Sequence, residues 1–219
     1  MTVMLVTGST KPGLDGIGIC TGTLIAPDLV LTAAHCVLDE QGKELPKIFV
    51  VLSAEKYSPA SKWVAHPKYQ FLGNQGGHAA TTHDLALVKL PGPLGPDFLL
   101  AELPKFEVPI NKDMNLSLAG YGETVAGDPR SMGNLISSGT SGRMFSVDGD
   151  ADHHLRLAGG QICHGDSGGP IFQDSDSHTV LIGVNSVGDC QAWGEGTSVA
   201  YHLDWIRSAS RGLGAEVNF

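Results

Sequence analysis

Ser167 lies in a loop whose composition suits a nucleophile. The loop at residues 163–170 reads C-H-G-D-S-G-G-P, with three glycines within three positions of the serine. Glycine carries no Cβ, so the backbone can adopt positive φ and can approach a ligand closely. A hydroxyl beside converging backbone N–H groups provides a nucleophile and a pocket for an oxyanion. Such a loop also occurs without chemistry, so the rest of the chain must supply a base and a carboxylate.

Two other segments can supply these groups. His35 stands at the end of an expected apolar strand, in the motif T-A-A-H-C. A neutral imidazole is a suitable general base for a hydroxyl at neutral pH. Asp84 begins the most apolar strand that we expect in the protein. A buried carboxylate needs hydrogen-bond partners, and one beside the histidine would fix its tautomer and stabilise the imidazolium. Singly, His35 is explained as a half-buried histidine and Asp84 as a turn residue, but with Ser167 they predict a catalytic triad.

These three segments together resemble the trypsin/chymotrypsin-like serine peptidase family. The motifs T-A-A-H-C, D-L-A-L-V-K-L and G-D-S-G-G-P stand at residues 32–36, 84–90 and 165–170 almost as that family writes them. The likeness runs from about residue 20 to residue 205, and the three motifs together are highly specific.

The resemblance implies a role for each motif residue. Ser167 would be the nucleophile, His35 the general base and then acid, and Asp84 the orienting carboxylate. Backbone N–H groups of Gly165 and Ser167 would form the oxyanion hole. The implied function is a serine endopeptidase that hydrolyses peptide bonds through an acyl-enzyme intermediate and needs no cofactor.

The four cysteines are even in number, and no C-x-x-C spacing occurs, so disulfides are expected and a structural zinc site is not. Disulfides indicate export to an oxidising compartment, either secreted or periplasmic. The resemblance pairs Cys20 with Cys36 beside the histidine. It pairs Cys163 with Cys190, which would join the serine loop to a wall of the substrate pocket.

The substrate pocket departs from the trypsin type. In the family, the residue six before the nucleophile lies at the base of the primary specificity pocket, and here it is Gln161 instead of aspartate. A neutral amide cannot offset the desolvation of a substrate guanidinium as a carboxylate does. We therefore expect a preference for apolar or neutral side chains, unless Glu195 on the far pocket strand points inward. The other expected substrate-binding residues are Ile162, His164, Ser186, Val187 and Gly188.

Asp166 is expected to be a buried structural aspartate. In the family a freed N-terminal amine, usually in an I-V-G-G-like sequence, pairs with the residue at this position, and no such sequence begins this chain. A buried carboxylate without a counter-charge or hydrogen bonds would shift its pKa and become neutral. Either the chain is truncated or another group replaces the amine, and Arg143 and Arg156 are the candidate cations in the same half.

The elements that must position these residues are short strands. Turn residues separate apolar segments at residues 3–6, 20–25, 29–32, 47–52, 62–65 and 83–90, and again at 116–121, 134–138, 142–147, 171–172 and 180–185. Trp205, Ile206 and Ala209 recur at helical spacing before Gly212, which predicts a C-terminal α-helix. The sequence predicts an all-β fold, and the resemblance implies two six-stranded antiparallel β-barrels with the active site in the cleft between them.

We expect a single peptidase domain over residues 1–219. Its N-terminal barrel would span residues 1–104, its C-terminal barrel 105–199 and its helix 200–212. A proline- and glycine-rich segment at residues 91–96 precedes the expected boundary.

The formal charge of −9 argues against nucleic acid or an anionic membrane as partner, and no apolar run reaches the length of a membrane span. The expected partners are peptide or protein substrates and protein inhibitors, and the expected state is a monomer. No metal is expected. Alternating Asp148, Asp150 and Asp152 suggest a calcium loop but lack the downstream glutamate, so a solvated acidic loop is favoured. The nearby His153 and His154, and His178, show no metal-binding spacing.

Two alternatives to an active enzyme remain at this stage. The chain could be a non-catalytic homologue that uses the barrels as a protein-binding module. It could also be a zymogen-like form that becomes competent after processing or partner binding.

Overall fold

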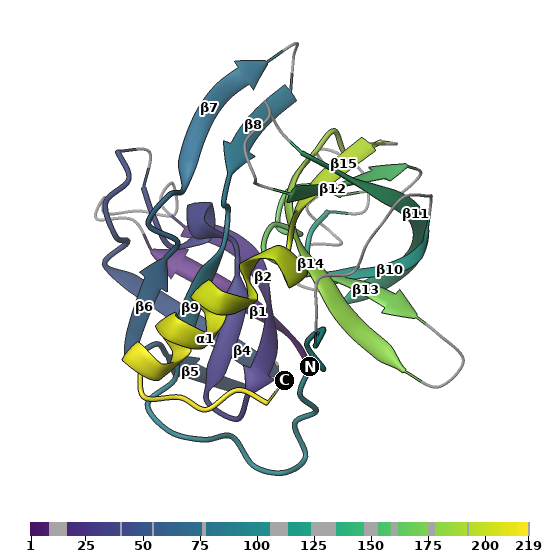
Figure 1. Cartoon of the computed structure of the whole chain (residues 1–219). Helices are drawn as coiled ribbons and strands as arrows, with labels where there is room; N and C mark the ends of the chain where they lie inside the picture. The colour runs from purple at the N-terminus through teal and green to yellow at the C-terminus, as the bar shows by residue number, and fades with distance from the viewer. Residues whose placement is uncertain are drawn as a thin grey trace.

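A computed structural model describes residues 1–8, 17–39, 41–53, 55–75, 78–105, 114–123, 135–146, 153–158, 162–174, 178–191 and 193–218. Within these ranges the chain forms two antiparallel β units and a C-terminal helix (Figure 1). The all-β class and the terminal helix that the sequence predicts are therefore confirmed. None of the helices in the described ranges has the length and apolarity to cross a membrane.

The first unit is a sheet of seven strands in the order β5-β4-β1-β2-β3-β9-β6. Its buried centre is β3 and the segment before and within β9, whose side chains are apolar on both faces, as expected for a strand covered on each side. The strand bounds are β1 Thr2–Gly8, β2 Ile17–Ala26, β3 Leu29–Thr32, β4 Lys47–Ser53, β5 Lys56–Pro59, β6 Lys62–Ala65 and β9 Ala86–Lys89.

This sheet has one strand more than the six expected. The additional strand β5 pairs with β4 across a short turn and has mostly exposed side chains. It therefore lacks the alternation of apolar and polar residues that predicts a half-buried strand.

The second unit is a closed six-stranded barrel in the order β10-β11-β12-β15-β14-β13, as expected. One long strand, β11, replaces the two short strands predicted at residues 134–147, because its small Gly-Thr-Ser segment stays paired with β10. The bounds are β10 Met114–Gly120, β11 Ile136–Ser146, β12 His153–Ala158, β13 Pro170–Asp174, β14 Thr179–Gly188 and β15 Trp193–Ser198. Residues 106–113 before β10 lie outside the described ranges, so the boundary at residues 104 and 105 stays a prediction.

A separate hairpin of β7 (Gln70–Gln75) and β8 (His78–Thr82) stands above the two units in Figure 1. No strand was predicted at these residues. The base of β8 lies against the barrel strand β14, where the hydroxyls of Thr81 and Ser186 are 2.9 Å apart. The hairpin thus borders the region between the sheet and the barrel.

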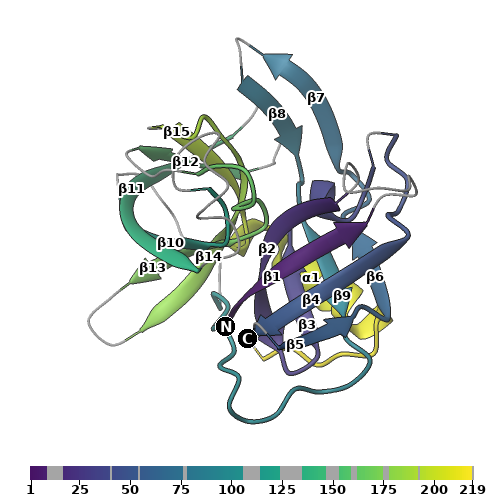
Figure 2. The ribbon, with the colours of Figure 1, turned by 180° about the vertical axis from the view of Figure 1, so that it is seen from behind.

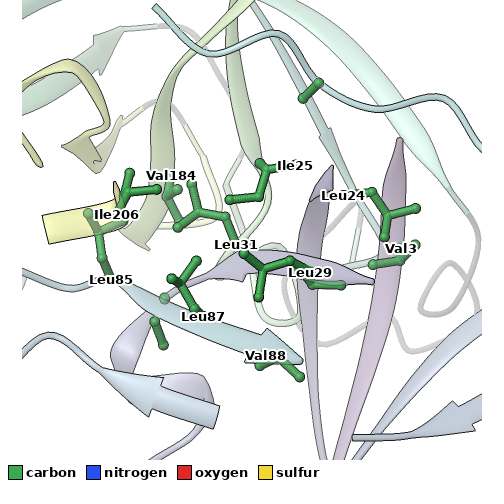
Figure 3. Close-up of a cluster of buried hydrophobic side chains, with 14 of the residues drawn as sticks. Val3, Leu24, Ile25, Leu29, Leu31, Leu85, Leu87, Val88, Val184 and Ile206 are labelled. Atoms are coloured by element: carbon green, nitrogen blue, oxygen red, sulfur yellow. The ribbon is translucent and has the colours of Figure 1, made fainter. Parts of the chain in front are cut away.

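The C-terminal helix α1 (Leu203–Gly212) covers the first sheet, and the two opposite views in Figures 1 and 2 show it on one face of that sheet. The 3₁₀ helix η3 (Ala200–His202) leads into it from the barrel. Fully buried Ile206 lies beside Leu85 and Val184 in the hydrophobic core of Figure 3. The end of the chain therefore packs on the half that carries His35 and Asp84.

Candidate active site

Strand pairing brings His35 and Asp84 together. His35 lies in the 3₁₀ helix η2 (Ala34–Cys36), directly after β3, and Asp84 lies two residues before β9. Because β3 and β9 are antiparallel neighbours, with Thr32 opposite Ala86, the end of one strand lies beside the start of the other. Two residues 49 positions apart thereby meet at the same end of these two neighbouring strands.

Asp84 is fully buried and accepts hydrogen bonds from three donors. Its Oδ2 accepts from His35 Nδ1 at 2.7 Å and from the Ser186 hydroxyl at 2.5 Å, and its Oδ1 accepts from the His35 backbone N–H at 3.0 Å. Burial alone would raise the pKa of Asp84, but the charge of His35 and these hydrogen bonds hold it below its ordinary value. The carboxylate is therefore ionised at neutral pH.

His35 is oriented for proton transfer by the same contact. Burial opposes its protonation, but the negative charge and the hydrogen bond of Asp84 outweigh burial, so the pKa of His35 lies above its ordinary value. With Nδ1 donating to Asp84, the neutral ring has its lone pair on Nε2. This ring lines the same cavity as Ser167.

The Ser167 hydroxyl donates to the backbone carbonyl of Ser186 at 3.3 Å, not to the imidazole of His35. Ser167 and His35 nevertheless border one cavity of about 300 Å³. Catalytic hydrogen bonds are often long or misaligned without substrate and become shorter in the complex with it. The structure thus brings the three predicted triad residues to one place without an Oγ to Nε2 hydrogen bond.

The backbone N–H groups around Ser167 fall into two sets. Those of Asp166, Gly168 and Gly169 donate to backbone carbonyls at 3.0, 2.7 and 3.0 Å. Those of Gly165 and Ser167 donate to no acceptor in the part of the chain that the structure describes. Two unused donors in a folded loop are what an oxyanion hole requires.

Contacts on the opposite side fix the direction of these two amides. The His164 carbonyl accepts from the Glu123 N–H at 2.9 Å, and the Asp166 carbonyl accepts from Gly169. In a trans peptide the carbonyl and the following N–H point in opposite directions, so the N–H groups of Gly165 and Ser167 face away from these contacts. Gly165 has φ +98°, a conformation that favours glycine.

Asp166 obtains its partners from backbone amides. Its Oδ1 accepts from the Gly122 N–H at 2.9 Å and its Oδ2 from the Cys163 N–H at 3.0 Å. Burial raises the pKa of Asp166, and these two hydrogen bonds oppose the rise. A Cβ on Gly120 or Gly122 would lie 2.0 or 2.6 Å from the nearest Asp166 atom, so the G-Y-G spacing makes room for the carboxylate.

Neither of the two arginines expected as a possible counter-charge for Asp166 is seen to contact it in the described residues. Arg156 on β12 pairs with Glu195 on β15 at 3.0 Å, so its charge is directed to that carboxylate. Arg143 lies on β11, and its side chain is outside the described part of the structure. The acidic segment with Asp148, Asp150 and Asp152 also lies outside the described residues, as does the His153 side chain, whereas His154 is buried on β12 and His178 is exposed.

Two disulfides hold the loops of the site. Cys20 of β2 is bonded to Cys36 of η2, and Cys163 is bonded to Cys190. These are the pairs that the resemblance implied. The first bond lies next to His35, and the second joins the serine loop to the segment after β14.

The cavity contains five of the six expected substrate-binding residues, and the sixth, Gln161, lies outside the described residues. The five are Ile162, His164, Ser186, Val187 and Gly188. Glu195 does not line the cavity and is paired with Arg156. Three further lining residues were not expected: Tyr69, Phe71 and Thr81, which lie on or near the β7–β8 hairpin. The sequence signal for Tyr69 and Phe71 was their aromatic character at alternate positions, and none marked Thr81.

Comparison with known proteins agrees with this geometry. The sequence model of a protein family described as Trypsin matches residues 4–206. The chain is 30% identical over 212 residues to chymotrypsin of Phaedon cochleariae, covering 87% of this chain and 72% of that protein. It is 29% identical over 220 residues to coagulation factor XII of Rattus norvegicus, covering 88% of this chain. It is 28% identical over 223 residues to urokinase-type plasminogen activator of Gallus gallus, covering 87% of this chain.

The match is to one part of the larger relatives, since it covers 36% of the factor XII sequence and 50% of the urokinase-type sequence. The family match, in contrast, covers nearly the whole of this chain. The chain therefore belongs to the trypsin family.

Proposed function

We propose that this protein is a serine endopeptidase that hydrolyses peptide bonds through an acyl-enzyme intermediate. Members of the trypsin family are serine endopeptidases. The observation that carries the proposal for this chain is local. Ser167 lies beside two N–H groups without acceptors, and its cavity also contains the ring of His35, which is held by Asp84.

The reaction follows from these positions. A rotation about the Cα–Cβ bond of Ser167 exchanges the Ser186 carbonyl for His35 Nε2 as the acceptor of its proton. Oγ then attacks the scissile carbonyl while His35 takes the proton, and Asp84 stabilises the imidazolium. The carbonyl oxygen gains negative charge and accepts hydrogen bonds from the N–H groups of Gly165 and Ser167. His35 gives the proton to the leaving amine, and a water repeats the sequence to release the acid.

Asp166 supports this arrangement by a different contact from the family's freed amine. Its two amide donors come from Cys163, the first residue of the serine loop, and from Gly122 in the turn after β10, so they tie the two segments together. We propose that these hydrogen bonds hold the oxyanion loop in place. The hydrogen bond from Ser167 to the Ser186 carbonyl is the observation that favours the alternative, a zymogen-like or non-catalytic binding module.

The pocket supports a preference for apolar or neutral side chains. Ile162 is almost fully buried against Gly188 and Gly194, where a Cβ on either glycine would lie 2.5 Å from an Ile162 atom. These glycines are paired residues of β14 and β15, so Ile162 packs on one face of the two pocket strands. Glu195 is paired with Arg156, so it offers no carboxylate to a basic substrate side chain.

The proposed partners are peptide or protein substrates and protein inhibitors, with no cofactor and with the chain acting as a monomer. Both disulfides would be reduced in a cytosolic environment, which supports a secreted or periplasmic location.

A peptide-library digest tests this proposal. The oxidised protein is expected to cleave after apolar or small neutral residues, and Ser167→Ala is expected to cleave nothing. Glu195→Gln serves as the pocket control and is expected to leave the side-chain preference unchanged. Preferential cleavage after Arg or Lys that disappears in Glu195→Gln would contradict the neutral pocket.

A further inference from the structure

Three buried histidines form a cluster behind the catalytic carboxylate. His66 follows β6, His83 immediately precedes Asp84, and His202 ends η3. Their side chains belong to residues only 9, 7 and 3% exposed, and one ring nitrogen of each lies within 4.8 Å of the others. Three imidazoles from three distant segments thus surround one point.

We propose that this cluster is a binding site for a divalent transition-metal ion, with zinc as the ion that its ligands best suit. Neutral imidazole is a common zinc ligand, and three histidines with a water in the fourth position form a tetrahedral site. The site is separate from the substrate cavity, which none of the three histidines lines. Zinc binding does not depend on the proposed peptidase activity, whereas the effect on catalysis described below rests on it.

Hydrogen bonds orient the first ligand. His202 Nδ1 donates to the Ser198 carbonyl at 2.6 Å, which leaves the lone pair of the neutral ring on Nε2. A carbonyl that fixes the tautomer in this way is the usual outer partner of a metal-binding histidine. His202 Nε2 lies 2.9 Å from His83 Nδ1 and accepts a hydrogen bond from it. Zinc would replace that proton between the two rings.

A metal site here requires small movements of His83 and His202 and a rotation of the His66 ring. Zinc–nitrogen bonds of about 2.0–2.1 Å place two tetrahedral ligands roughly 3.4 Å apart. The His83–His202 pair must therefore open slightly from 2.9 Å, and the third nitrogen must approach. The His66 ring is stacked on His83 with centroids 4.7 Å apart and an interplanar angle of 9°, so it must turn out of the stack for its lone pair to face the ion.

The backbone links this site to the triad. His83 has φ +47°, an uncommon value for a residue other than glycine, and its carbonyl accepts from the Leu85 N–H at 2.8 Å. This tight turn is centred on Asp84, so a movement of the His83 ring changes the position of the carboxylate. Zinc would join His83 to η3 and so fasten the C-terminal helix to the turn that carries Asp84.

Zinc titration by calorimetry tests the site on Ser167→Ala protein that has been treated with chelator and has intact disulfides. One zinc per chain is expected, together with a rise in Tm that magnesium does not produce. His66→Gln and His202→Gln should each weaken binding at least tenfold. His178→Gln, which changes an exposed histidine, is the matched control and should bind zinc as the parent does.

Replacement of zinc by cobalt gives a second readout that does not require activity, because tetrahedral Co²⁺ with histidine ligands absorbs visible light. The absorption should be lost in a folded His66→Gln protein. Binding that survives both His66→Gln and His202→Gln, for example at His35, would overturn the proposal, as would the absence of zinc binding by the parent.

In the active enzyme, zinc should lower kcat with little change in KM, and chelator should restore kcat. A protein that binds zinc as described but cleaves no peptide would support the metal site and contradict the proposed function. An active protein that binds no zinc would support the proposed function and contradict the metal site.

Discussion

The charge on Asp84 decides the protonation of His35. Its carboxylate is buried and accepts three hydrogen bonds. Burial lowers the pKa of His35, but the charge and hydrogen bond of Asp84 raise it by more. Below the raised pKa of His35 the ring is protonated and cannot act as a base, so kcat/KM should increase with pH through that value.

Asp84→Asn tests this electrostatic link. Without the negative charge, burial acts alone and lowers the pKa of His35, so the acidic limb of the pH profile of kcat/KM should move to lower pH. The rate at neutral pH should fall by roughly 10⁴-fold, because the amide also holds the wrong tautomer. An acidic limb that stays in place would show that Asp84 does not set the pKa of His35.

Gly122→Ala tests the support of Asp166. The new Cβ would lie 2.6 Å from Asp166 Cγ and 2.7 Å from its backbone nitrogen, so the serine loop must move. We expect a loss of about 1–3 kcal/mol in the free energy of unfolding, measured with denaturant, and a lower kcat. Gly95→Ala is the control, since a Cβ there meets nothing within 4 Å. Equal stability of the two variants would contradict the proposed support.

Single residues were predictable where the chemistry needs a particular side chain. Ser167, His35 and Asp84 stand in recognisable motifs, and the structure brings them together. The hydrogen-bond donors to Asp166 were not predictable, because they are backbone N–H groups, which every residue except proline carries. The hydroxyl of Ser186 on Asp84 was also missed, since Ser186 was expected to contact substrate and not the carboxylate.

At the scale of secondary structure, the β7–β8 hairpin supplies a wall of the cavity that the sequence did not predict. Phe71 lies on β7, lines the cavity and is 61% exposed. Strands with a buried centre, such as β3, were predicted from their apolar runs. Phe71 of the hairpin and most side chains of β5 are exposed, so periodicity does not reveal these strands.

Phe71→Ala tests the role of this wall. Removal of the ring should raise KM for a peptide substrate by about tenfold, or about 1.4 kcal/mol, with kcat almost unchanged, because the ring lines the cavity and has no part in the proposed chemistry. Tyr57→Ala on β5, which is 67% exposed and outside the cavity, is the control. Similar kinetics in both variants would exclude Phe71 from substrate binding.

The end of the chain packs on the half of the molecule that carries His35 and Asp84. Helix α1 follows the barrel but packs on the first sheet, with fully buried Ile206 in the same core as Leu85. The helix was predictable from the spacing of its apolar residues. The surface on which it packs was not predicted, because spacing gives the apolar face of a helix and not its partner.

Ile206→Ala should therefore cost about 2–5 kcal/mol in the free energy of unfolding, measured by denaturant titration. It should also reduce activity, since its neighbour Leu85 follows Asp84. Ser208→Ala changes an exposed position of the same helix and should alter stability by less than about 0.5 kcal/mol. A similar loss in both variants would mean that the core packing of Ile206 is not responsible for its loss, since alanine favours the helix at both positions.

We propose that Ser167 is a nucleophile activated by His35 in this folded, disulfide-bonded chain. Reaction with a fluorophosphonate probe measures this property directly, because the probe traps an activated serine. We predict stoichiometric labelling at Ser167, no labelling of Ser167→Ala and strongly slowed labelling of His35→Ala. Failure of the folded, oxidised protein to react, or equal labelling of Ser167→Ala, would contradict the claim.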